Sequence, residues 1–467
     1  MDGAFSCSKA ERFFEEIKGK KIAFCGIGVT NTPLIKKFLQ KGADVTVCDR
    51  STRETIGEVI DEMEASGAKI SLGNNYLKDL DVDIIFRAPG IRFHLPEFEE
   101  YRKKGVVVTS EMEVFFELCP CKIFAVTGSD GKTTTTTLIS EMLKAQGYKV
   151  HLGGNIGRAL LPIIEDVNAD DFAVVELSSF QLISMRRSPD IAVVTNVAPN
   201  HLDIHKDMAE YVDSKKNIFL HQNAFSRTVL NLDNFITASF RDEIRGKLSM
   251  FSRKGEVHNG ADCDENGDIF YVRNGEKEFI MHRDNIRLFG DHNVENYLAA
   301  IAATEGYVEN ENIVKVAKDF GGVEHRIEFV REFDGVKYYN DSIATNPTRT
   351  IAGLNAFSQK IIIIAGGYDK QIPFEPLAPK IIEKVKVLIL MGVTAKMLEK
   401  AVRECPGFDE TELKILHASD MEDAVRLAVD NASEGDIVSL SPACSSFDLY
   451  KNFEVRGNHY KEIVNSL

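Results

Sequence analysis

The sequence predicts an α/β protein of three domains in series, each a mostly parallel sheet flanked by helices. Strand-like apolar runs alternate with helical patterns along the chain, which is typical of crossover-connected parallel sheets. A length of 467 residues suits about three domains of roughly 100–200 residues each. Hydrophobic residues make up 44% and charged residues 27%, so the chain can bury a sizeable core.

The first domain is expected over residues 1–118. The runs KKIAFCG (20–26) and ADVTVCD (43–49) read as strands, and the segment TNTPLIKKFLQKG between them reads as a helix. Further strands are expected in DVDIIFRAPG (81–90) and GVVVTS (105–110). Because parallel strands need crossover connections, this alternation predicts a doubly wound sheet.

The second domain is expected over 119–322 and the third over 323–467. The second begins with a strand that leads through a glycine-rich loop into a helix (121–147), and strands follow at 171–179 and 190–197. Short alternating runs with Gly and Asn turns at 250–282 predict a small antiparallel insert, and 290–306 returns to helix. In the third domain, GVKYYNDS, KIIIIAGG, KVLILMG and DIVSLSPA read as strands.

The charge balance disfavours two classes of partner. Asp plus Glu number 71 against 56 Lys plus Arg, a formal net charge of −15, whereas nucleic-acid and anionic-membrane binders need a basic face. No apolar run approaches the roughly 18 residues of a spanning helix, and the N-terminal segment lacks a signal-peptide pattern. We therefore expect a cytoplasmic protein without membrane insertion. Its eight cysteines then read as thiols, and the one close pair, Cys119-Pro-Cys121, is a weak indication of zinc.

The strongest local motif is Gly128-Ser129-Asp130-Gly131-Lys132-Thr133-Thr134, which follows a strand and opens a helix. Backbone N–H groups at a helix start, with one lysine, form a polyphosphate cradle, and the next hydroxyl suits Mg²⁺. The spacing is shorter than that of the usual nucleotide loop, which would need glycine at Val126. The alternative is an ordinary glycine-rich turn.

A weaker motif occurs in the first domain. Gly26-Ile27-Gly28 begins a dinucleotide-like fingerprint, but its third glycine is replaced by Asn31. Asp49 ends the next strand, where a ribose-binding acid would lie. A bound nucleotide and a simple tight turn remain equally good interpretations of this motif.

Two side chains that follow strands are candidate metal ligands. Glu176 ends the strand FAVVE, and ligands collect at the carboxyl ends of strands in open α/β sheets, so it is a candidate for Mg²⁺. The alternative is a solvated acid. His201 is either a metal ligand or an ordinary loop histidine.

Lys215 occupies an otherwise apolar helix stripe. Met208, Tyr211, Val212 and Ile218 recur at helical spacing around it. A lysine there is either a snorkelling surface residue or a neutral amine that is modified or functional.

Together the motifs resemble the Mur ligases, ATP-dependent amide-forming enzymes of peptidoglycan precursor synthesis, over nearly the whole chain. In order they are GSDGKTT (128–134), GGNIG (153–157), ELSSFQL (176–182), N-x-x-x-x-H (196–201), Lys215, GDHNVEN (290–296), EHRIE (324–328), NDSIATN (340–346), GGYDK (366–370) and LSPACSSFDLYKNFEVRG (440–457). The resemblance implies Rossmann-like first and third domains around a central P-loop-type ATPase domain. The NDSxATN segment and the C-terminal motif point to the member that adds D-glutamate.

The resemblance implies a two-step reaction. ATP would phosphorylate the alanyl carboxylate of UDP-N-acetylmuramoyl-L-alanine, and the amine of D-glutamate would attack the acyl phosphate. We expect the enzyme to be a monomer. The alternatives are another Mur-type or a folylpolyglutamate-type ligase with a different amino acid, a nicotinamide dehydrogenase, and a nucleotide-binding regulatory protein without chemistry.

The resemblance also assigns roles to residues. The catalytic residues would be Lys132, Glu176, His201 and Lys215. ATP would be bound by Gly128, Ser129, Asp130, Gly131, Lys132, Thr133, Thr134, Asn293, Asn296, Arg326 and Asp341. The UDP-substrate would be bound by Ile27, Val29, Thr30, Asp49, Pro89, Gly90, Asn155, Ser178, Gln181 and His201. D-Glutamate would be bound by Thr345, Lys370, Ser446, Phe447 and Phe453. Mg²⁺ would be bound by Thr133, Glu176, His201 and Lys215, the lysine as a CO₂-derived carbamate.

The chain departs from the family pattern at two positions. Many relatives have a lysine within NDSxATN, where this chain has Ile343, and Lys370 and Arg349 are the candidates to compensate for the lost charge. Asp130 replaces the commoner asparagine and adds negative charge beside the phosphates.

Overall fold

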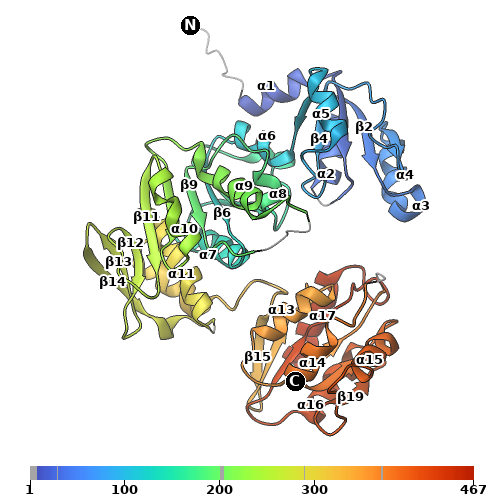
Figure 1. Cartoon of the computed structure of the whole chain (residues 1–467), viewed down its shortest axis with the longest axis vertical. Helices are drawn as coiled ribbons and strands as arrows, with labels where there is room; N and C mark the ends of the chain where they lie inside the picture. The colour runs from blue at the N-terminus through green and yellow to red at the C-terminus, as the bar shows by residue number, and fades with distance from the viewer. Residues whose placement is uncertain (1–7, 29, 200–203, 289, 370–371) are drawn as a thin grey trace. The chain divides into compact units, whose positions relative to one another are not determined.

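A computed structural model of the chain describes residues 8–28, 30–199, 204–288, 290–369 and 372–467. The chain divides into two compact units, Met1–Asp319 and Phe320–Leu467. Three sheets of five, nine and six strands follow one another in sequence, which confirms the predicted α/β class (Figure 1). Two of these sheets belong to the first unit and one to the second.

The first sheet is fully parallel in the order β3-β2-β1-β4-β5. Its strands are β1 (Lys21–Cys25), β2 (Asp44–Asp49), β3 (Lys69–Leu72), β4 (Ile84–Arg87) and β5 (Val107–Thr109). The helices are α1 (Lys9–Glu16), α2 (Asn31–Gln40), α3 (Arg53–Ile56), α4 (Glu58–Ala65), α5 (Pro96–Lys103) and α6 (Glu111–Leu118). Strands β2 and β3 are added on one side of β1, and β4 and β5 on the other. The loops that follow β1 and β4 therefore lie next to each other at the carboxyl ends of the strands, where such sheets bind ligands.

The second sheet has the order β14-β13-β12-β11-β10-β9-β6-β8-β7. Its strands are β6 (Lys122–Thr127), β7 (Val150–Gly154), β8 (Phe172–Glu176), β9 (Ile191–Val194), β10 (Arg227–Asn231), β11 (Lys247–Ser252), β12 (Gly260–Cys263), β13 (Asp268–Arg273) and β14 (Glu276–His282). Neighbours from β7 to β12 are parallel. The strands β12, β13 and β14 are antiparallel, as the turn-rich pattern at 250–282 predicts, although β11 within that range pairs in parallel.

Helices cover the second sheet and carry much of the candidate site. They are α7 (Lys132–Ala145), the 3₁₀ helix η1 (Leu161–Asp166), α8 (Ser179–Leu182), α9 (Met208–Leu220), α10 (Phe235–Ser239), the 3₁₀ helices η2 (Phe240–Glu243) and η3 (Arg283–Asn285), α11 (Asp291–Thr304) and α12 (Asn310–Asp319). Both α7 and α11 are 14 residues long, and they pack against each other.

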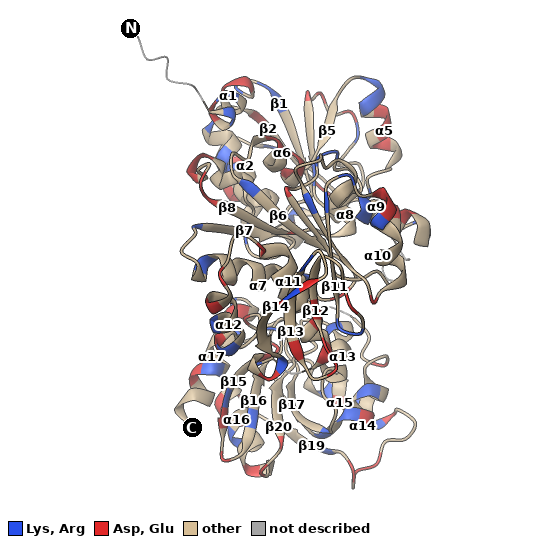
Figure 2. Ribbon diagram, turned by 90° about the vertical axis from the view of Figure 1, so that its left-hand side faces the viewer, with Lys and Arg blue, Asp and Glu red and all other residues tan. Residues whose placement is uncertain are grey.

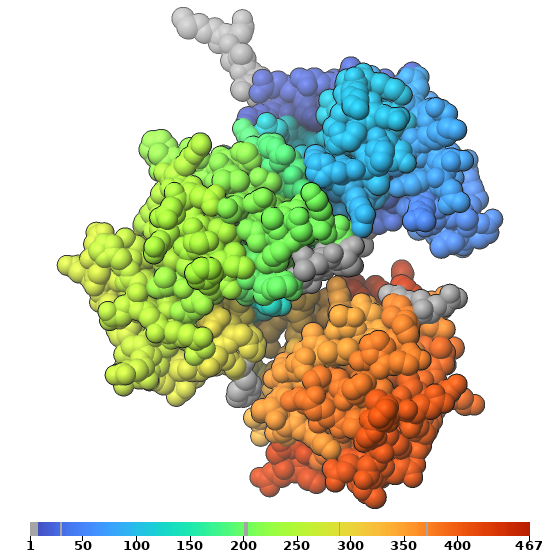
Figure 3. Space-filling model, in the orientation of Figure 1, coloured from blue at the N-terminus to red at the C-terminus, as the bar shows by residue number. Residues whose placement is uncertain are grey.

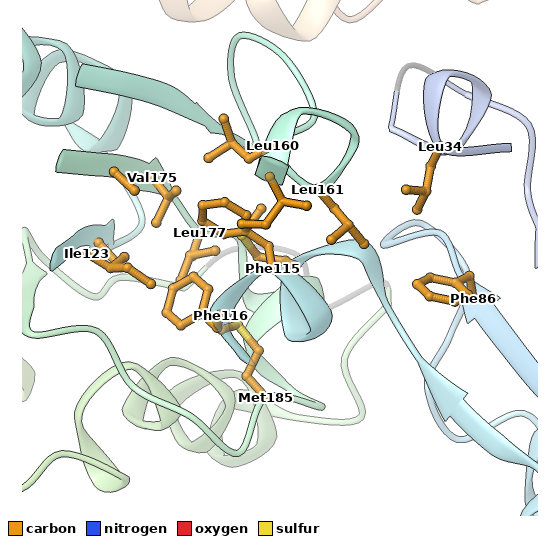
Figure 4. Packing of buried hydrophobic residues seen from close by; sticks show 14 of the residues in the cluster. Leu34, Phe86, Phe115, Phe116, Ile123, Leu160, Leu161, Val175, Leu177 and Met185 are labelled. Atoms are coloured by element: carbon orange, nitrogen blue, oxygen red, sulfur yellow. The ribbon is translucent and has the colours of Figure 1, made fainter. Parts of the chain in front are cut away.

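The first two sheets share one hydrophobic core. Phe115 and Phe116 on α6 are buried in a cluster that runs from the helices of the first sheet to the strands of the second. Figure 4 shows these rings among Ile123, Leu160, Leu161, Val175, Leu177 and Met185. Burying a phenylalanine side chain is worth roughly 1.5–3 kcal/mol, so α6 holds the two sheets together strongly. In Figure 3 the blue and green surfaces of this unit meet.

Polar contacts reinforce the same junction. The buried Glu111 carboxylate accepts 2.8 Å hydrogen bonds from the backbone N–H groups of Leu160 and Leu161, and thereby caps η1. Lys37 of α2 and Lys41, which follows the last residue of α2, both pair with Glu165 of η1. The Lys41–Glu165 contact spans 124 positions and the Glu111 contacts span 49 and 50, so the junction joins distant segments and the two sheets form one compact unit.

The third sheet has the order β15-β16-β20-β17-β18-β19, with β15 antiparallel to β16 and the remaining pairs parallel. Its strands are β15 (Glu328–Phe333), β16 (Val336–Asn340), β17 (Ile361–Ala365), β18 (Val385–Leu390), β19 (Lys414–His417) and β20 (Ile437–Leu440). The helices are α13 (Pro347–Asn355), α14 (Ala378–Lys384), α15 (Ala395–Arg403), α16 (Met421–Asn431) and α17 (Phe453–Ser466).

Charged side chains of both signs are interspersed over the described chain, as Figure 2 shows. Within the described ranges, no helix has the length and apolar character needed to cross a bilayer.

Candidate active site

The glycine-rich loop between β6 and α7 has a backbone that only glycine fits at two positions. Gly128 has φ +152°, and a β-carbon there would lie 1.9 Å from Thr195 Oγ1. Gly131 has φ +76°, and a β-carbon there would lie 2.3 Å from Asn296 Oδ1. Both positions combine a left-handed or extended positive φ with a close neighbour, so the loop passes tightly against the segment after β9 and against α11.

The segment after β9 holds the loop in place. The Ser129 N–H donates to the Asn196 carbonyl at 2.8 Å, and the Asp130 N–H donates to Asn196 Oδ1 at 2.9 Å. Thr195 Oγ1 donates to the Asp130 carbonyl at 2.6 Å. The sequence motif indicated a role for His201 in this segment, and the anchoring roles of Thr195 and Asn196 were not predicted from it.

The start of α7 is suited to bind an anion. Gly131 occupies the N-cap position and contributes no side-chain cap, and the following residue is Lys132. Lys132 Nζ donates to the Ser129 carbonyl at 2.8 Å, and the Thr133 side chain is buried beside the loop. A helix start that lacks a side-chain cap presents its N–H groups to phosphate oxygens.

Glu176 lies buried at the end of β8, with 1% of its surface exposed, so it is not the solvated acid of the alternative interpretation. Asn155 Nδ2 donates to Glu176 Oε1 at 2.6 Å. Glu176 Oε2 is also buried and has no hydrogen-bond partner among the described residues. A buried carboxylate oxygen without a donor is costly, and a hard cation is a fitting partner for it.

Lys215 is buried on α9 with 2% exposure, which excludes a snorkelling surface lysine. Its Nζ donates to the Gly128 carbonyl at 2.7 Å, lies 3.4 Å from Thr127 Oγ1, and sits 4.7 Å from the centroid of the Tyr211 ring. Burial, followed by repulsion from Lys132, lowers the pKa of Lys215 to about 7. A large fraction of this amine is therefore neutral and nucleophilic near neutral pH.

Two aromatic residues that were not predicted from the sequence lie in this region: Tyr211, whose ring faces Lys215, and His205, whose ring meets that of Tyr211 edge to face at 5.3 Å. Tyr211, which the sequence indicates only as one member of an apolar stripe, places its hydroxyl 2.9 Å from Ser129 Oγ. His205 stacks on Phe180 with ring centroids 5.1 Å apart, and its Nε2 lies 2.9 Å from Ser179 Oγ. The available signal was a tyrosine hydroxyl within an apolar helix face, which needs a polar partner when buried.

The two asparagines of α11 belong to the same region. Asn296 Nδ2 donates to Asn293 Oδ1 at 3.1 Å, and Thr135 Oγ1 of α7 donates to Asn296 Oδ1 at 3.2 Å. A cavity of about 140 Å³ opens beside the loop, lined in part by Asp130, Asn196, His292, Glu295 and Asn296. The predicted nucleotide-binding residues of the second sheet are thus brought together around the loop.

In the first sheet, Asp49 organises the loop that follows β1. Its two carboxylate oxygens accept hydrogen bonds from the Ile27 and Ser51 N–H groups, each at 2.8 Å. Asn31, which replaces the third glycine, donates from Nδ2 to the Gly26 carbonyl at 2.8 Å. Thr30 takes the N-cap position of α2 without a side-chain hydrogen bond.

Arg87, at the end of β4, is a buried residue that the sequence analysis missed. Its guanidinium donates to the carbonyls of Ile91 at 2.7 Å and Pro89 at 3.3 Å, and to that of Phe180 in α8 at 3.0 Å. Burial lowers the pKa of Arg87 to about 10. One arginine therefore links the loop that contains Pro89 and Gly90 to the helix that follows Glu176.

Ser178 and Gln181 form a capping box at the start of α8. The Gln181 N–H donates to Ser178 Oγ at 3.3 Å, and the Ser178 N–H donates to Gln181 Oε1 at 2.9 Å. The structure thus places both residues at the carboxyl edge of the sheet in a local structural role, and their contacts to substrate stay a prediction.

In the second unit, which contains the third sheet, the backbone around Arg326 is strained. His325 has φ +62° and Ile327 has φ +45°, and a β-branched residue in this region is rare. Asp341, at the end of β16, accepts from the Ile327 N–H at 3.3 Å and from Ser441 Oγ at 3.1 Å. Burial raises the pKa of Asp341 to about 7, against the opposing effects of Arg326 and Arg349. Strain of this kind is commonly retained at functional positions.

The predicted amino-acid-binding residues lie along the carboxyl edge of the third sheet. Ser446 is buried, whereas Phe447 is 63% exposed and meets Tyr368 edge to face at 6.0 Å. Thr345 lies in the turn after β16, and Phe453 begins α17 and meets the His325 ring at 5.8 Å.

Arg456 is a second buried arginine that the sequence analysis did not assign. Its Nε donates to Ser342 Oγ at 3.0 Å, and its Nη2 donates to the Cys444 carbonyl at 3.1 Å. Burial lowers the pKa of Arg456 to about 10. It fastens α17 to the turns after β16 and β20.

Arg349 lies against the backbone of Ile343. It is exposed in the first turn of α13, and its Nη1 donates to the Ile343 carbonyl at 3.1 Å. The guanidinium therefore lies at the backbone of residue 343, although the side chain there is apolar.

Three predicted residues, Val29, His201 and Lys370, lie outside the described residues. Among the residues that the structure describes, no three His, Cys, Asp or Glu side chains are grouped to hold a metal ion. The Cys119–Cys121 pair accordingly has no further ligand of these types beside it in that part of the chain.

Comparison with protein families gives two matches. Residues 126–304 match the Mur ligase middle domain, and residues 325–444 match the Mur ligase, glutamate ligase domain. The UDP-N-acetylmuramoylalanine–D-glutamate ligase of Acetivibrio thermocellus is 53% identical over 469 aligned positions, covering 98% of this chain and 99% of the relative. The ligase of the same name from Clostridium acetobutylicum is 50% identical over 458 positions, covering 97% and 98%.

Solved structures show the same fold at low identity. The UDP-N-acetylmuramate-alanine ligase of Thermotoga maritima matches with a TM-score of 0.56 and 17% identity, covering 96% of this chain and 99% of that one. A UDP-N-acetylmuramoyl-L-alanyl-D-glutamate–2,6-diaminopimelate ligase matches with a TM-score of 0.51 and 18% identity, covering 91% and 92%.

Proposed function

The chain belongs to the Mur ligase family, and we infer from this membership that it adds D-glutamate to UDP-N-acetylmuramoyl-L-alanine in an ATP-dependent, amide-forming reaction of peptidoglycan synthesis. The observation that carries this function is the 53% identity with a D-glutamate ligase over 98% of the chain. The geometry of the loop, Glu176 and Lys215 supports the ATP-dependent chemistry, and the relatives specify the amino acid.

In the first step, we propose that the loop and Lys132 hold the β- and γ-phosphates of ATP while the alanyl carboxylate attacks the γ-phosphorus. The N–H groups at the start of α7 and the Lys132 ammonium stabilise the negative charge that builds up on the transferred group. The products of this step are ADP and an acyl phosphate. Activation is needed because a carboxylate is a poor electrophile.

Glu176 and Thr133 are the described residues that would hold Mg²⁺. The unpartnered Glu176 oxygen and the buried Thr133 hydroxyl lie beside the loop and are hard oxygen donors, which fit this cation. When bound, the ion supplies neutralisation of phosphate charge. His201 remains a predicted ligand on the basis of its motif.

We propose that Lys215 acts as a carbamate. Its neutral amine attacks CO₂, one proton leaves, and the product is an anionic carbamate that suits a cation-rich site. The pKa of about 7 and the position 2.7 Å from the Gly128 carbonyl support this reaction. An unmodified ammonium would instead add a second positive charge beside Lys132.

The remaining roles follow the three proposed domains, 1–118, 119–322 and 323–467. The loop after β1 and the loop held by Arg87 would bind the UDP group, so no nicotinamide cofactor is involved. The carboxyl edge of the third sheet would bind D-glutamate through Thr345, Ser446, Phe447, Phe453 and Lys370. We propose that the protein is a cytoplasmic monomer.

Arg349 is proposed to supply the positive charge that Ile343 lacks. Its guanidinium already lies at the Ile343 carbonyl, and D-glutamate and the acyl phosphate are both anionic. A guanidinium can bind a carboxylate through two parallel hydrogen bonds.

The test is phosphate release from ATP with Mg²⁺, UDP-N-acetylmuramoyl-L-alanine and a panel of amino acids of both hands. Release with D-glutamate alone is expected. Release with another amino acid instead would support a ligase activity and reject the proposed specificity for D-glutamate. Absence of release with every amino acid would reject the proposed function.

A further inference from the structure

Cys119 and Cys121 form a close thiol pair in the connection between α6 and β6. Their sulfur atoms lie 3.5 Å apart. Cys119 is partly exposed, Pro120 is exposed, and Cys121 is buried at 7% exposure. Cys119 has φ −57° and ψ 122°, an extended conformation in which side chains two residues apart point to the same side.

We propose that Cys119 and Cys121 form a redox-active dithiol, which low-molecular-weight disulfides convert into an intramolecular disulfide. Cys119 is the attacking thiol, because it is the more accessible of the two. Cys121 is the resolving thiol, because it lies behind Cys119 and within reach of its sulfur. The two sulfurs need to approach by roughly 1.5 Å to reach the ~2.05 Å of a disulfide bond.

The electrostatics of the pair agree with this order. A hydrogen bond from the Cys121 thiol lowers the pKa of Cys119, and the same interaction, with burial, raises the pKa of Cys121. The thiolate is the reactive form of cysteine, so attack by Cys119 is favoured.

The reaction proceeds in two exchanges. The Cys119 thiolate attacks one sulfur of the disulfide RSSR, forms a mixed disulfide and releases RS⁻. Cys121 then loses its proton, attacks the Cys119 sulfur and releases the second RS⁻. In total, two protein thiols and one RSSR give one protein disulfide and two RSH, so the reagent is reduced by the two electrons that the protein loses.

The chain contains two internal comparisons. Cys25 and Cys48 are paired positions on the neighbouring strands β1 and β2, but both are fully buried, and a hydrogen bond with the Cys48 thiol, together with burial, raises the pKa of Cys25. Cys405 is partly exposed, as Cys119 is, and its Sγ contacts the Pro406 carbonyl rather than a second thiol. Among the described cysteines, only the Cys119–Cys121 pair combines a solvent-accessible thiol with a second thiol beside it.

The experiment treats the fully reduced, full-length protein with oxidised glutathione under anaerobic conditions and maps the products by intact and peptide mass. The wild type is expected to lose two hydrogen atoms on the peptide that contains Cys119 and Cys121, without a retained glutathione there. Cys121→Ser and Cys121→Ala are expected to keep glutathione on Cys119, because the resolving thiol is absent. Cys405→Ser is the matched control and is expected to form the disulfide as the wild type does.

Two results would overturn the proposal. One is a wild type that retains glutathione on Cys119 as the Cys121 variants do. The other is a Cys119 that reacts no faster than Cys405. Circular dichroism of each reduced variant checks folding, and the use of two Cys121 variants guards against one that fails to fold. The chemistry is read by mass, so it is independent of the proposed ligase function.

Discussion

The glycine-rich loop of the first unit and the carboxyl edge of the third sheet are built in different ways. The loop is fixed by backbone conformation and by buried partners: Gly128 and Gly131 exclude any β-carbon, and Asn196 holds two successive N–H groups. The carboxyl edge of the third sheet instead presents side chains: Phe447 is 63% exposed, and Arg349 is exposed beside Ile343. A phosphate is recognised by geometry common to all nucleotides, whereas an amino acid is recognised by side chains that can vary between relatives. We therefore expect substitutions at the loop to abolish chemistry and substitutions at the edge to produce graded changes.

The largest effect is expected for Lys215→Ala. Removing a group that stabilises charge at the reacting centre typically costs about 10²–10³-fold in kcat. Ligase turnover measured by phosphate release should fall at least that far. Short carboxylic acids should restore part of it, whereas added bicarbonate should not. Lys216→Ala is the matched control, since Lys216 pairs with Glu243 at the surface and should be dispensable. Full activity of Lys215→Ala would reject the carbamate role.

The second effect concerns the fixed backbone of the loop. In Gly131→Ala the new β-carbon would meet Asn296, so the KM for ATP should rise by roughly 10–100-fold, as strain of about 1–3 kcal/mol implies. Gly147 follows the C-terminal end of α7 and also has a positive φ, so Gly147→Ala introduces similar backbone strain, but its β-carbon would have no neighbour within 4 Å. It should lower thermal stability and leave the KM for ATP unchanged. Equal KM values for the two variants would argue against a preformed loop.

A third, pH-dependent effect follows from the lowered pKa of Lys215. Below about pH 7 the amine is increasingly protonated and cannot attack CO₂, so carbamate and activity should both decline as the pH falls. Well below this pKa, the neutral fraction drops by about tenfold per pH unit. Carbon-13 NMR with labelled bicarbonate would measure the carbamate directly, with Lys215→Ala as the blank. A carbamate signal that is constant between pH 6 and 8, values chosen around this pKa, would contradict the expectation.

The smallest effect is expected at the variable edge. Arg349→Ala should raise the KM for D-glutamate by about tenfold, the value of one charged hydrogen bond of roughly 1.5 kcal/mol, with ATP binding unchanged. Adding Ile343→Lys to that variant should restore most of the loss, because it returns a cation to the same place. If the double variant is no better than Arg349→Ala, the two positions do not substitute for each other.

Sequence reasoning succeeded where a residue contradicts its local pattern. Lys215 interrupts an apolar stripe, and Gly128 and Gly131 flank a strand-to-helix turn. Their unusual environments could therefore be predicted before the fold was known. The strand-and-helix alternation likewise predicted the three sheets, including the antiparallel strands near 250–282.

The residues that were missed act across long sequence separations. Arg87 reaches the Phe180 carbonyl 93 positions away, and Tyr211 reaches Ser129 across 82 positions. An arginine at a strand end and a tyrosine on a helix have ordinary local patterns. The packing of the two sheets fixes the partner of Arg87, and the packing of α9 against the second sheet fixes the partner of Tyr211. No pattern in the sequence distinguishes Arg87 from a solvated arginine before the sheets are assembled.

The shared core of the first two sheets has a consequence for how the chain loses its structure. Since Phe115 and Phe116 are packed between both sheets, neither sheet can melt without exposing the apolar surface of the other. The 319 residues of the first unit should therefore denature as one cooperative block, and the third sheet should denature in a transition of its own. Damage to a side chain on α6, outside the glycine-rich loop, would then reduce the fraction of molecules in which that loop is folded at all.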